Sequence, residues 1–311
     1  MGLQSRLLRP TVILLSLSLG ASGSFAAGEC RFAKLPPVTL KNMGPCQFDV
    51  SLASFAGSAA EQAMCLLTPV LPGGKLGERL TELPEPLQRV GQPDGLPDRD
   101  ALRKFLRDRG LEDLFGPALS EPVAHAHDND PSSRPTTYFV IHDTSSPNFG
   151  RKALPADIDS DTGINNLKRY ACSNRIERAH VFINRLGEIF SPHDFSVAWR
   201  ATKFEMATNF AQALRGLFLH NELIQPRQHA AGYRGRNDFK APEPGFSDAQ
   251  YETLAIVYTV ASVRTGFWMI PAYHAVLDDG IYDKHDDPQN FVLSAFAEKL
   301  RQLRDRLTRR R

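Results

Sequence analysis

Two histidines and one aspartate occupy positions at which a protein could bind a metal ion. His142 ends the strand-forming run Tyr138–Ile141, and small polar residues follow it at once. An isolated histidine in such a place is most often a packed core residue, so a functional interpretation requires partners elsewhere in the chain. His274 follows a long helical pattern, and Asp287 lies thirteen residues further on, in a turn before a proline.

These three residues form a known type of ligand set. Two neutral imidazoles and one carboxylate suit a zinc ion that keeps one position open for water, which is typical of catalytic rather than structural zinc. We therefore expect His142, His274 and Asp287 to converge on one Zn²⁺. Asp286, the neighbour of Asp287, is a rival for the third ligand position.

The other histidines are weaker candidates for a metal site. The polar segment SEPVAHAHDNDPSSRP contains His125, His127, Asp128 and Asp130. A flexible linker offers no preformed geometry to a metal, so we expect no site there. His180 is interpreted as a core residue or as the support of a ligand. We interpret the remaining ones as surface or packing residues: His193, His220 and His229.

The strands that must position the ligands are expected in the second half of the chain. One is predicted at Tyr138–His142 and another in RGLFLHNELIQ, residues 215–225. The segment RAHVFINRLGEIFSP, residues 178–192, is typical of a hairpin with its turn at Asn184–Gly187.

Helical patterns alternate with these strands. A helix is predicted over residues 161–172, and a last helix over about residues 290–307. Between them, Ser247 and Gln250 form a capping box in front of an apolar stripe that ends at Gly266. This alternation predicts an α/β fold with a mixed central β-sheet flanked by helices.

The first residues have the order of a secretory signal peptide. Arg6 and Arg9 precede the short apolar run Thr11–Leu19, and small residues up to Ala26 suit a cleavage site. The run is shorter than the ~20 apolar residues that span a bilayer, so no integral membrane span is expected. We assign residues 1–26 to a signal peptide, 27–130 to an N-terminal loop-rich and helical extension with a linker, and 131–311 to the main domain.

The extension is rich in proline and glycine and carries two predicted helices. One lies near residues 59–67. The other, in DRDALRKFLRDRGLEDLFG, places Leu102, Phe105 and Leu106 on one face and stops at Gly110.

The cysteines and the charge balance indicate the compartment and the kind of partner to expect. An exported chain is expected to oxidise its cysteines, but Cys30, Cys46, Cys65 and Cys172 allow three connectivities and the sequence does not choose. The chain has 37 basic and 35 acidic residues, and the totals become equal without the two signal-peptide arginines. This balance gives no reason to expect a nucleic-acid partner. We expect a monomer.

Six short motifs follow one another between about residues 135 and 291. They are YFVIHDTSS, AHVFINRLGEIF, AW at 198–199, LHNEL, FSDAQYETLA, and His274 with KHDDPQNF. In this order they resemble the zinc-dependent N-acetylmuramoyl-L-alanine amidases of the type 2 family, which share a fold with phage lysozyme-type amidases and peptidoglycan recognition proteins. The resemblance implies His142, His274 and Asp287 as zinc ligands and Glu222 as the acid/base carboxylate.

Several positions depart from the family pattern. Arg200 follows Trp199 where the family usually has a histidine, and we keep both as candidate substrate-binding residues. The family's lysine two residues before the aspartate ligand is His285 here, and Lys284 stands one residue earlier. Either cation could stabilise a developing oxyanion, so both are candidate catalytic residues. His220 and Asn221 replace the family's glycine and isoleucine before Glu222.

The resemblance implies hydrolysis of the amide bond between N-acetylmuramic acid and L-alanine in peptidoglycan or muropeptides. A periplasmic or secreted location suits that substrate. One alternative is a non-catalytic peptidoglycan-binding module, although binding-only members lose the third ligand and Asp287 is present here. Another alternative is a metallopeptidase that cuts within the stem peptide, which would use the same metal site.

Overall fold

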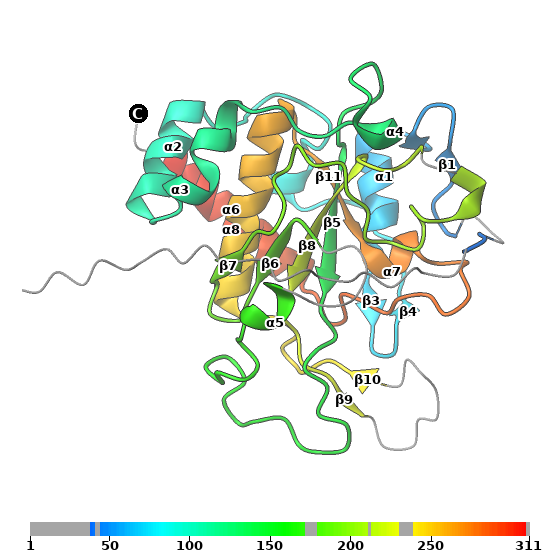
Figure 1. The fold of residues 1–311 in the computed structure, drawn as a ribbon, viewed down its shortest axis with the longest axis vertical. Coiled ribbons are helices and arrows are strands. Elements are labelled where there is room, and N and C mark those ends of the chain that lie inside the picture. Colours follow the sequence, from blue (N-terminus) through cyan, green and yellow to red (C-terminus); the bar gives the residue numbers. More distant parts are fainter. Residues whose placement is uncertain (1–37, 41–43, 172–178, 211–212, 230–238, 309–311) are drawn as a thin grey trace, which may run out of the picture.

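Five strands form the central sheet, in the spatial order β11, β5, β8, β6, β7 (Figure 1). The computed structural model describes residues 38–40, 44–171, 179–210, 213–229 and 239–308. The sheet strands are β5 (Tyr138–Asp143), β6 (Val181–Ile183), β7 (Ile189–Phe190), β8 (Phe218–Leu223) and β11 (Ile270–Tyr273). β11, β5, β8 and β6 run parallel, and β7 runs antiparallel to β6. The prediction of a mixed α/β sheet is confirmed.

Helices and small two-stranded ribbons surround this sheet. The described α-helices are α1 (Ala59–Leu66), α2 (Arg99–Asp108), α3 (Glu112–Phe115), α4 (Ala126–Asn129), α5 (Lys168–Ala171), α6 (Asp248–Thr265), α7 (His274–Leu277) and α8 (Leu293–Thr308). The ribbons pair β1 (Phe48–Asp49) with β2 (Ser54–Phe55), β3 (Val70–Leu71) with β4 (Lys75–Leu76), and β9 (Gln228–His229) with β10 (Phe239–Lys240). Short 3₁₀ helices lie at η1 (Glu85–Leu87), η2 (Pro117–Ser120) and η3 (Thr208–Phe210).

Both faces of the central strand β5 are covered. All its residues are buried, as expected for a parallel strand packed on two sides. On one face Phe139 packs edge-on against Tyr258 of α6, with ring centroids 5.1 Å apart. On the other face Tyr138 packs against Phe55 of β2, with ring centroids 5.2 Å apart. Because side chains alternate along a strand, His142 lies on the same face as Tyr138.

Helix α6 begins and ends where the sequence predicts. Ser247 accepts a hydrogen bond from the backbone N–H of Gln250, and the Gln250 side chain accepts one from the N–H of Ser247. The helix stops at Gly266, whose φ of +82° is left-handed and suits glycine. The predicted last helix is also found, as α8.

The helix predicted over residues 161–172 is much shorter than expected. Only α5 is helical there, and residues 172–178 lie outside the described part of the chain. Polar side chains compete for the backbone in the preceding segment: Asp161 accepts the N–H of Ile164, and the Asn165 amide donates to the carbonyls of Asp159 and Asp161. Such local hydrogen bonds favour turns over a helix.

The N-terminal extension packs into the same hydrophobic core as the sheet. The Tyr138 hydroxyl accepts the N–H of Phe55 at 3.0 Å and donates to the Gln62 side chain at 2.8 Å. Both predicted helices of the extension are present, as α1 and α2. A disulfide joins Cys46 to Cys65. The predicted signal peptide, Cys30 and Cys172 lie outside the described residues.

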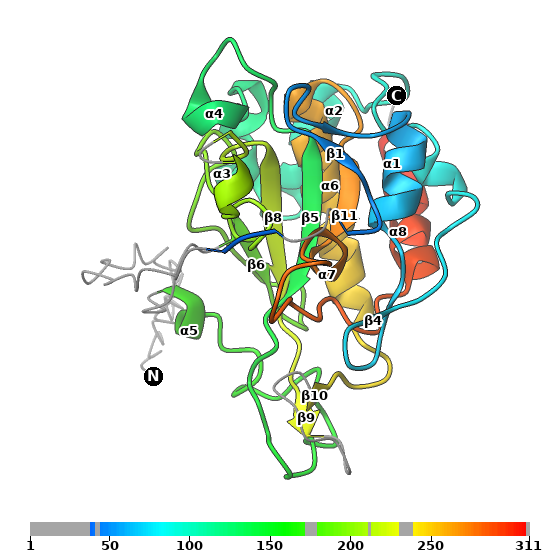
Figure 2. The same ribbon diagram turned by 90° about the vertical axis from the view of Figure 1, so that its right-hand side faces the viewer.

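The segment predicted as a flexible linker is ordered. His127 and Asp128 donate their backbone N–H groups to the carbonyls of Ala213 and Arg215. Further along the chain, the β9–β10 ribbon and the segment after β5 project beyond the end of the sheet in both views (Figures 1 and 2). In the part of the chain that the structure describes, no helix has the length and apolar character to cross a membrane.

Candidate metal centre

The three predicted ligands lie together at the carboxyl end of the sheet. Nδ1 of His142 is 2.8 Å from Nδ1 of His274, and His274 Nδ1 is 3.1 Å from Oδ2 of Asp287. His142 Nδ1 is 3.8 Å from the same Asp287 oxygen. All three side chains are buried. Three ligand atoms that converge in this way are a candidate site for one metal ion.

Strand register brings the two imidazoles together. β5 and β11 are parallel neighbours in which Ile141 pairs with Tyr273, so the next residues, His142 and His274, leave the sheet side by side. The loop that carries Asp287 is held at two points. The carbonyl of Asp287 accepts the N–H of Ala275 at 2.8 Å, and the side chain of Asp287 accepts the N–H of Asp143 at 3.0 Å.

The N-terminal extension also supports this loop. Gly74, in the turn between β3 and β4, has a left-handed φ of +71°, and a Cβ atom placed on it would lie 2.5 Å from the Cβ of Asp286. No larger residue fits between the turn and the loop without displacing one of them. Asp286 itself accepts a hydrogen bond from Gln289 at 2.7 Å and lies 3.6 Å from Arg227, so it is engaged outside the ligand group.

Glu222 lies next to the ligand group. It pairs with His142 across the β5–β8 ladder, and its Oε1 is 3.9 Å from His142 Nδ1. Its Oε2 atom is buried and has no hydrogen-bond partner among the described residues. Burial raises the pKa of Glu222 well above its usual value, and the nearby Asp287 carboxylate raises it further. An unpartnered carboxylate oxygen at this place can accept a proton from a water molecule.

The charges around the ligand group fit a bound cation. Burial, together with the neighbouring His274, holds the pKa of His142 well below its usual value, so its imidazole is neutral, as a metal ligand would need to be. Burial also acts to lower the pKa of His274, but Asp287 and Asp278 outweigh it and raise that pKa well above its usual value. Asp287 and Asp278 thus favour a positive charge beside them, which a divalent ion on Nδ1 of His274 would supply.

Asp278 connects the ligand group to His285. Its Oδ2 atom lies 3.0 Å from Nε2 of His274 and 2.6 Å from Nδ1 of His285. The His285 ring stacks on the His274 ring, with centroids 4.1 Å apart. The other candidate cation, Lys284, pairs with Asp279 instead. Of the two predicted oxyanion residues, His285 is therefore the one that contacts the ligand group.

Trp199 lies away from the ligand group. The Trp199 ring stacks on His193 at a centroid distance of 4.0 Å, and its carbonyl accepts the N–H of Gly216. Gly216 precedes β8, whereas Glu222 lies at the opposite end of that strand. A role of Trp199 and Arg200 in substrate binding stays a prediction.

Sequence reasoning missed a buried ion pair beside the site. Nη2 of Arg227 lies 2.9 and 2.8 Å from the two carboxylate oxygens of Asp143, and both side chains are buried. Burial raises the pKa of Asp143 to about 7; Arg227 opposes the rise, and Asp287 and Asp286 add to it. The position of Asp143 directly after His142 was a usable signal, but Arg227 has no motif around it.

The structure also corrects the interpretation of His220, which is more than a packing residue. Its Nδ1 lies 3.1 Å from Nε2 of His142, and its Nε2 lies 3.1 Å from Oε2 of Glu205. Glu205 stands three residues after Thr202, and T-x-x-E is the spacing of a capping box, which could have drawn attention to it.

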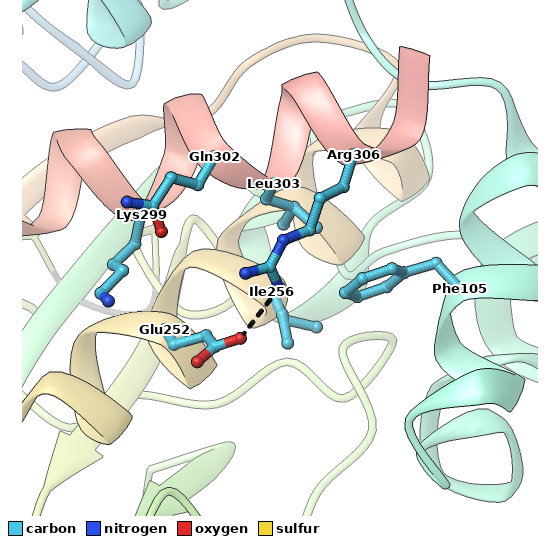
Figure 3. A pocket seen from close by; sticks show the side chains of 7 residues that line it. All are labelled: Phe105, Glu252, Ile256, Lys299, Gln302, Leu303 and Arg306. Atoms are coloured by element: carbon cyan, nitrogen blue, oxygen red, sulfur yellow. Dashed lines mark hydrogen bonds and ion pairs between the residues drawn. The ribbon is translucent and has the colours of Figure 1, made fainter. Parts of the chain in front are cut away.

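A small recess between helices α2, α6 and α8 is unrelated to the ligand group (Figure 3). Its charged residues are paired, Arg306 with Glu252 at 3.3 Å and Lys299 with Asp248 at 2.6 Å. The rest of the lining is mainly apolar helix-packing surface, including Phe105 and Ile256. Nothing in it offers chemistry to a substrate.

Comparison with known proteins adds little to the site. The sequence matches no protein-family model and no curated protein. A solved structure described as "crystal structure of Se-Met AmpD derivative" is similar to this chain at 20% sequence identity and a TM-score of 0.33. The match covers 58% of this chain and 92% of that one. A TM-score this low supports no conclusion about function.

Proposed function

We propose that this protein is a zinc-dependent amidase that hydrolyses the bond between N-acetylmuramic acid and L-alanine in peptidoglycan or muropeptides. The observation that carries the proposal is the convergence of His142, His274 and Asp287 beside the unpartnered oxygen of Glu222. Two imidazoles and a carboxylate next to a second, free carboxylate are what metal-assisted hydrolysis of an amide requires.

The three ligand residues would hold Zn²⁺, which supplies a water of lowered pKa and polarises the amide carbonyl. Glu222 takes the proton of the attacking water, because its free oxygen lies beside the ligand group and β8 holds it there. It then returns that proton to the departing amine of L-alanine.

His285 is the residue we assign to the oxyanion of the tetrahedral intermediate. It contacts His274 by stacking and is anchored through Nδ1 to the Asp278 carboxylate. An imidazole anchored on one nitrogen presents the other in a fixed direction, so it needs no reorganisation during the reaction. Lys284, committed to Asp279, is the alternative for the same role.

The proposed substrate belongs to the cell envelope, so we propose that the chain is exported and acts in the periplasm or outside the cell. The Cys46–Cys65 disulfide supports this location, since disulfides persist in oxidising compartments. The basic n-region and short apolar run at the N-terminus support it as well.

Digestion of purified sacculi tests the activity. The mature protein is incubated with sacculi, with and without removal of zinc by a chelator, and the products are analysed by mass spectrometry. The proposal expects intact stem peptides that begin with L-alanine, released only when zinc is present. Shortened stem peptides would instead identify a peptidase. Binding to sacculi without any release would identify a non-catalytic binding module.

A further inference from the structure

A chain of buried polar side chains leads away from the metal-facing side of His142. Nε2 of His142 is 3.1 Å from Nδ1 of His220, and Nε2 of His220 is 3.1 Å from Oε2 of Glu205. His142, His220 and Glu205 are each at most 1% exposed. Because water cannot reach these groups, each must be satisfied by its neighbour in this chain.

The Glu205 end fixes the direction of every hydrogen bond. Its Oε2 accepts the backbone N–H groups of Ala201 and Thr202, both at 3.1 Å, and the Thr202 hydroxyl at 2.8 Å. A carboxylate whose Oε2 is held by three donors acts as an acceptor, so Nε2 of His220 carries the proton and donates it to the other oxygen, Oε1, at 3.3 Å. Nδ1 of His220 is then an acceptor, and it must receive the Nε2–H of His142.

This assignment agrees with the second contact of His220. Nε2 of His180 lies 3.2 Å from the carbonyl of Val197, to which it must donate, so Nδ1 of His180 is an acceptor. That atom receives the backbone N–H of His220 at 3.1 Å. Every imidazole nitrogen of His180 and His220 thus has one consistent role.

The turn at residues 202–205, which carries Glu205, also approaches His274, the other predicted imidazole ligand. Thr202 and Glu205 bond reciprocally, because the Thr202 hydroxyl accepts the N–H of Glu205 at 3.1 Å. Between them, the backbone N–H of Phe204 donates to Oδ1 of Asp278 at 2.9 Å. The other oxygen of Asp278 is the one next to Nε2 of His274. The turn at 202–205 therefore contacts both histidine ligands through one intervening side chain each.

We propose that His220 and Glu205 are positioning residues that set the tautomer of His142. With its proton held on Nε2 by His220, His142 must present the lone pair of Nδ1 toward His274 and Asp287. A hydrogen bond on the far nitrogen of a ligating imidazole fixes the ring and makes it a better ligand. This proposal rests on the proposed zinc site, but it concerns metal affinity rather than the reaction catalysed.

Zinc affinity is the readout that tests the proposal. We expect Glu205→Gln and His220→Phe each to raise the dissociation constant for Zn²⁺ by roughly 10- to 100-fold, the usual effect of losing such a partner. The constant is measured by competition with a chromophoric chelator, on protein whose thermal unfolding is checked in parallel. His180→Phe is the comparison variant: it removes a buried imidazole that contacts His220 but not His142, and it should lower zinc affinity less than His220→Phe does.

Two further measurements separate positioning from general damage. If the residues act as one unit, the double variant Glu205→Gln/His220→Phe loses no more zinc affinity than His220→Phe alone. Nitrogen NMR of the zinc-loaded protein should show His142 and His220 both protonated at Nε2. If His220→Phe does not fold, the zinc affinity of Glu205→Gln and the NMR spectrum of the wild type still test the positioning role.

The outcomes are distinct from those of the amidase test. Wild-type zinc affinity in Glu205→Gln, or a proton on Nδ1 of His220, would overturn the positioning role and leave the amidase proposal intact. A wild-type protein that binds zinc but releases no stem peptide would overturn the amidase proposal alone. A wild-type protein that binds no zinc overturns both.

Discussion

His142 and Glu222 are direct partners across the parallel strands β5 and β8. Their side chains therefore emerge on the same face of the sheet, next to each other. This relationship makes Glu222 a suitable target for substitution, because strand pairing holds its backbone and it is not one of the three predicted ligands.

Glu222→Gln should abolish most of the hydrolysis while zinc stays bound. The amide keeps the shape of the side chain but cannot accept the proton of water, so turnover should fall by roughly 10²–10⁴, the usual contribution of a positioned acid/base group. Release of stem peptide from sacculi and metal analysis of the same sample measure the two effects. Glu78→Gln, the same change at an exposed position, is the control. Unchanged turnover in Glu222→Gln would show that this carboxylate is not the base.

Replacement of one imidazole ligand should remove the metal. The wild-type chain should hold one zinc, and His274→Ala should hold none after dialysis against metal-free buffer, because a carboxylate and one imidazole do not complete the site. Elemental analysis of both proteins at known concentration gives the ratio. Full zinc occupancy in His274→Ala would mean that the ion binds elsewhere.

The two candidate oxyanion residues should differ in their effect on catalysis. His285 contacts His274 and Asp278, whereas Lys284 is paired with Asp279. His285→Ala should therefore lower kcat by roughly 10²–10³, the usual effect of losing a donor to the oxyanion. Lys284→Ala serves as the comparison and should change kcat little. The reverse order would assign the role to the lysine.

Stability should fall as the pH drops below neutrality, in part through His180. Burial lowers the pKa of His180 from 6.5 to about 3, and His220 contributes to the shift. The unfolded chain therefore binds more protons than the folded one between these two pH values, so stability is full above pH 6.5 and is lost as the pH falls toward 3. The cost is about 2 kcal/mol at pH 5.

Urea unfolding of metal-free protein at pH 7 and pH 5 measures this cost without a contribution from zinc release. The variant His180→Gln cannot take up the proton, so it should lose less stability between the two pH values than the wild type does. An equal loss in both proteins would show that other groups carry the acid sensitivity.

Reduction of the Cys46–Cys65 disulfide should destabilise the protein. The bridge closes a loop with a sequence separation of 19 residues, for which the chain-entropy model gives about 3 kcal/mol of stabilisation. Urea unfolding with and without a reductant measures the loss. The double variant Cys46→Ala/Cys65→Ala should unfold at a lower urea concentration than the oxidised wild type. Reductant should lower the unfolding midpoint of this variant by less than it lowers that of the wild type.

The sheet and its main helices could be predicted because their signals are local. Strand-forming runs define β5 and β8, and the capping box of Ser247 and Gln250 marks the start of α6. The proximity of His142 and His274 also follows from a simple rule, since both residues come directly at the carboxyl ends of parallel strands. The roles of these residues in catalysis stay predictions.

The supporting residues could not be predicted, because their contacts join segments without any periodic pattern. His220 occupies a strand position that looks like ordinary packing, and only the approach of the turn at 202–205 reveals its polar partner Glu205. Arg227 reaches Asp143 from a segment with no repeat or motif. The helix predicted over residues 161–172 was wrong in length because its polar side chains bond the local backbone.

The hydroxyl of Tyr138 joins the first strand of the sheet to residues more than seventy positions earlier, through Phe55 and Gln62. A shortened protein that starts at residue 131 would leave this hydroxyl without its partners and expose the aromatic face around it to water. Expression of the second half alone is thus a poor route to crystals or to an engineered enzyme. A shortened protein should start before Cys46, so that the disulfide with Cys65 is kept.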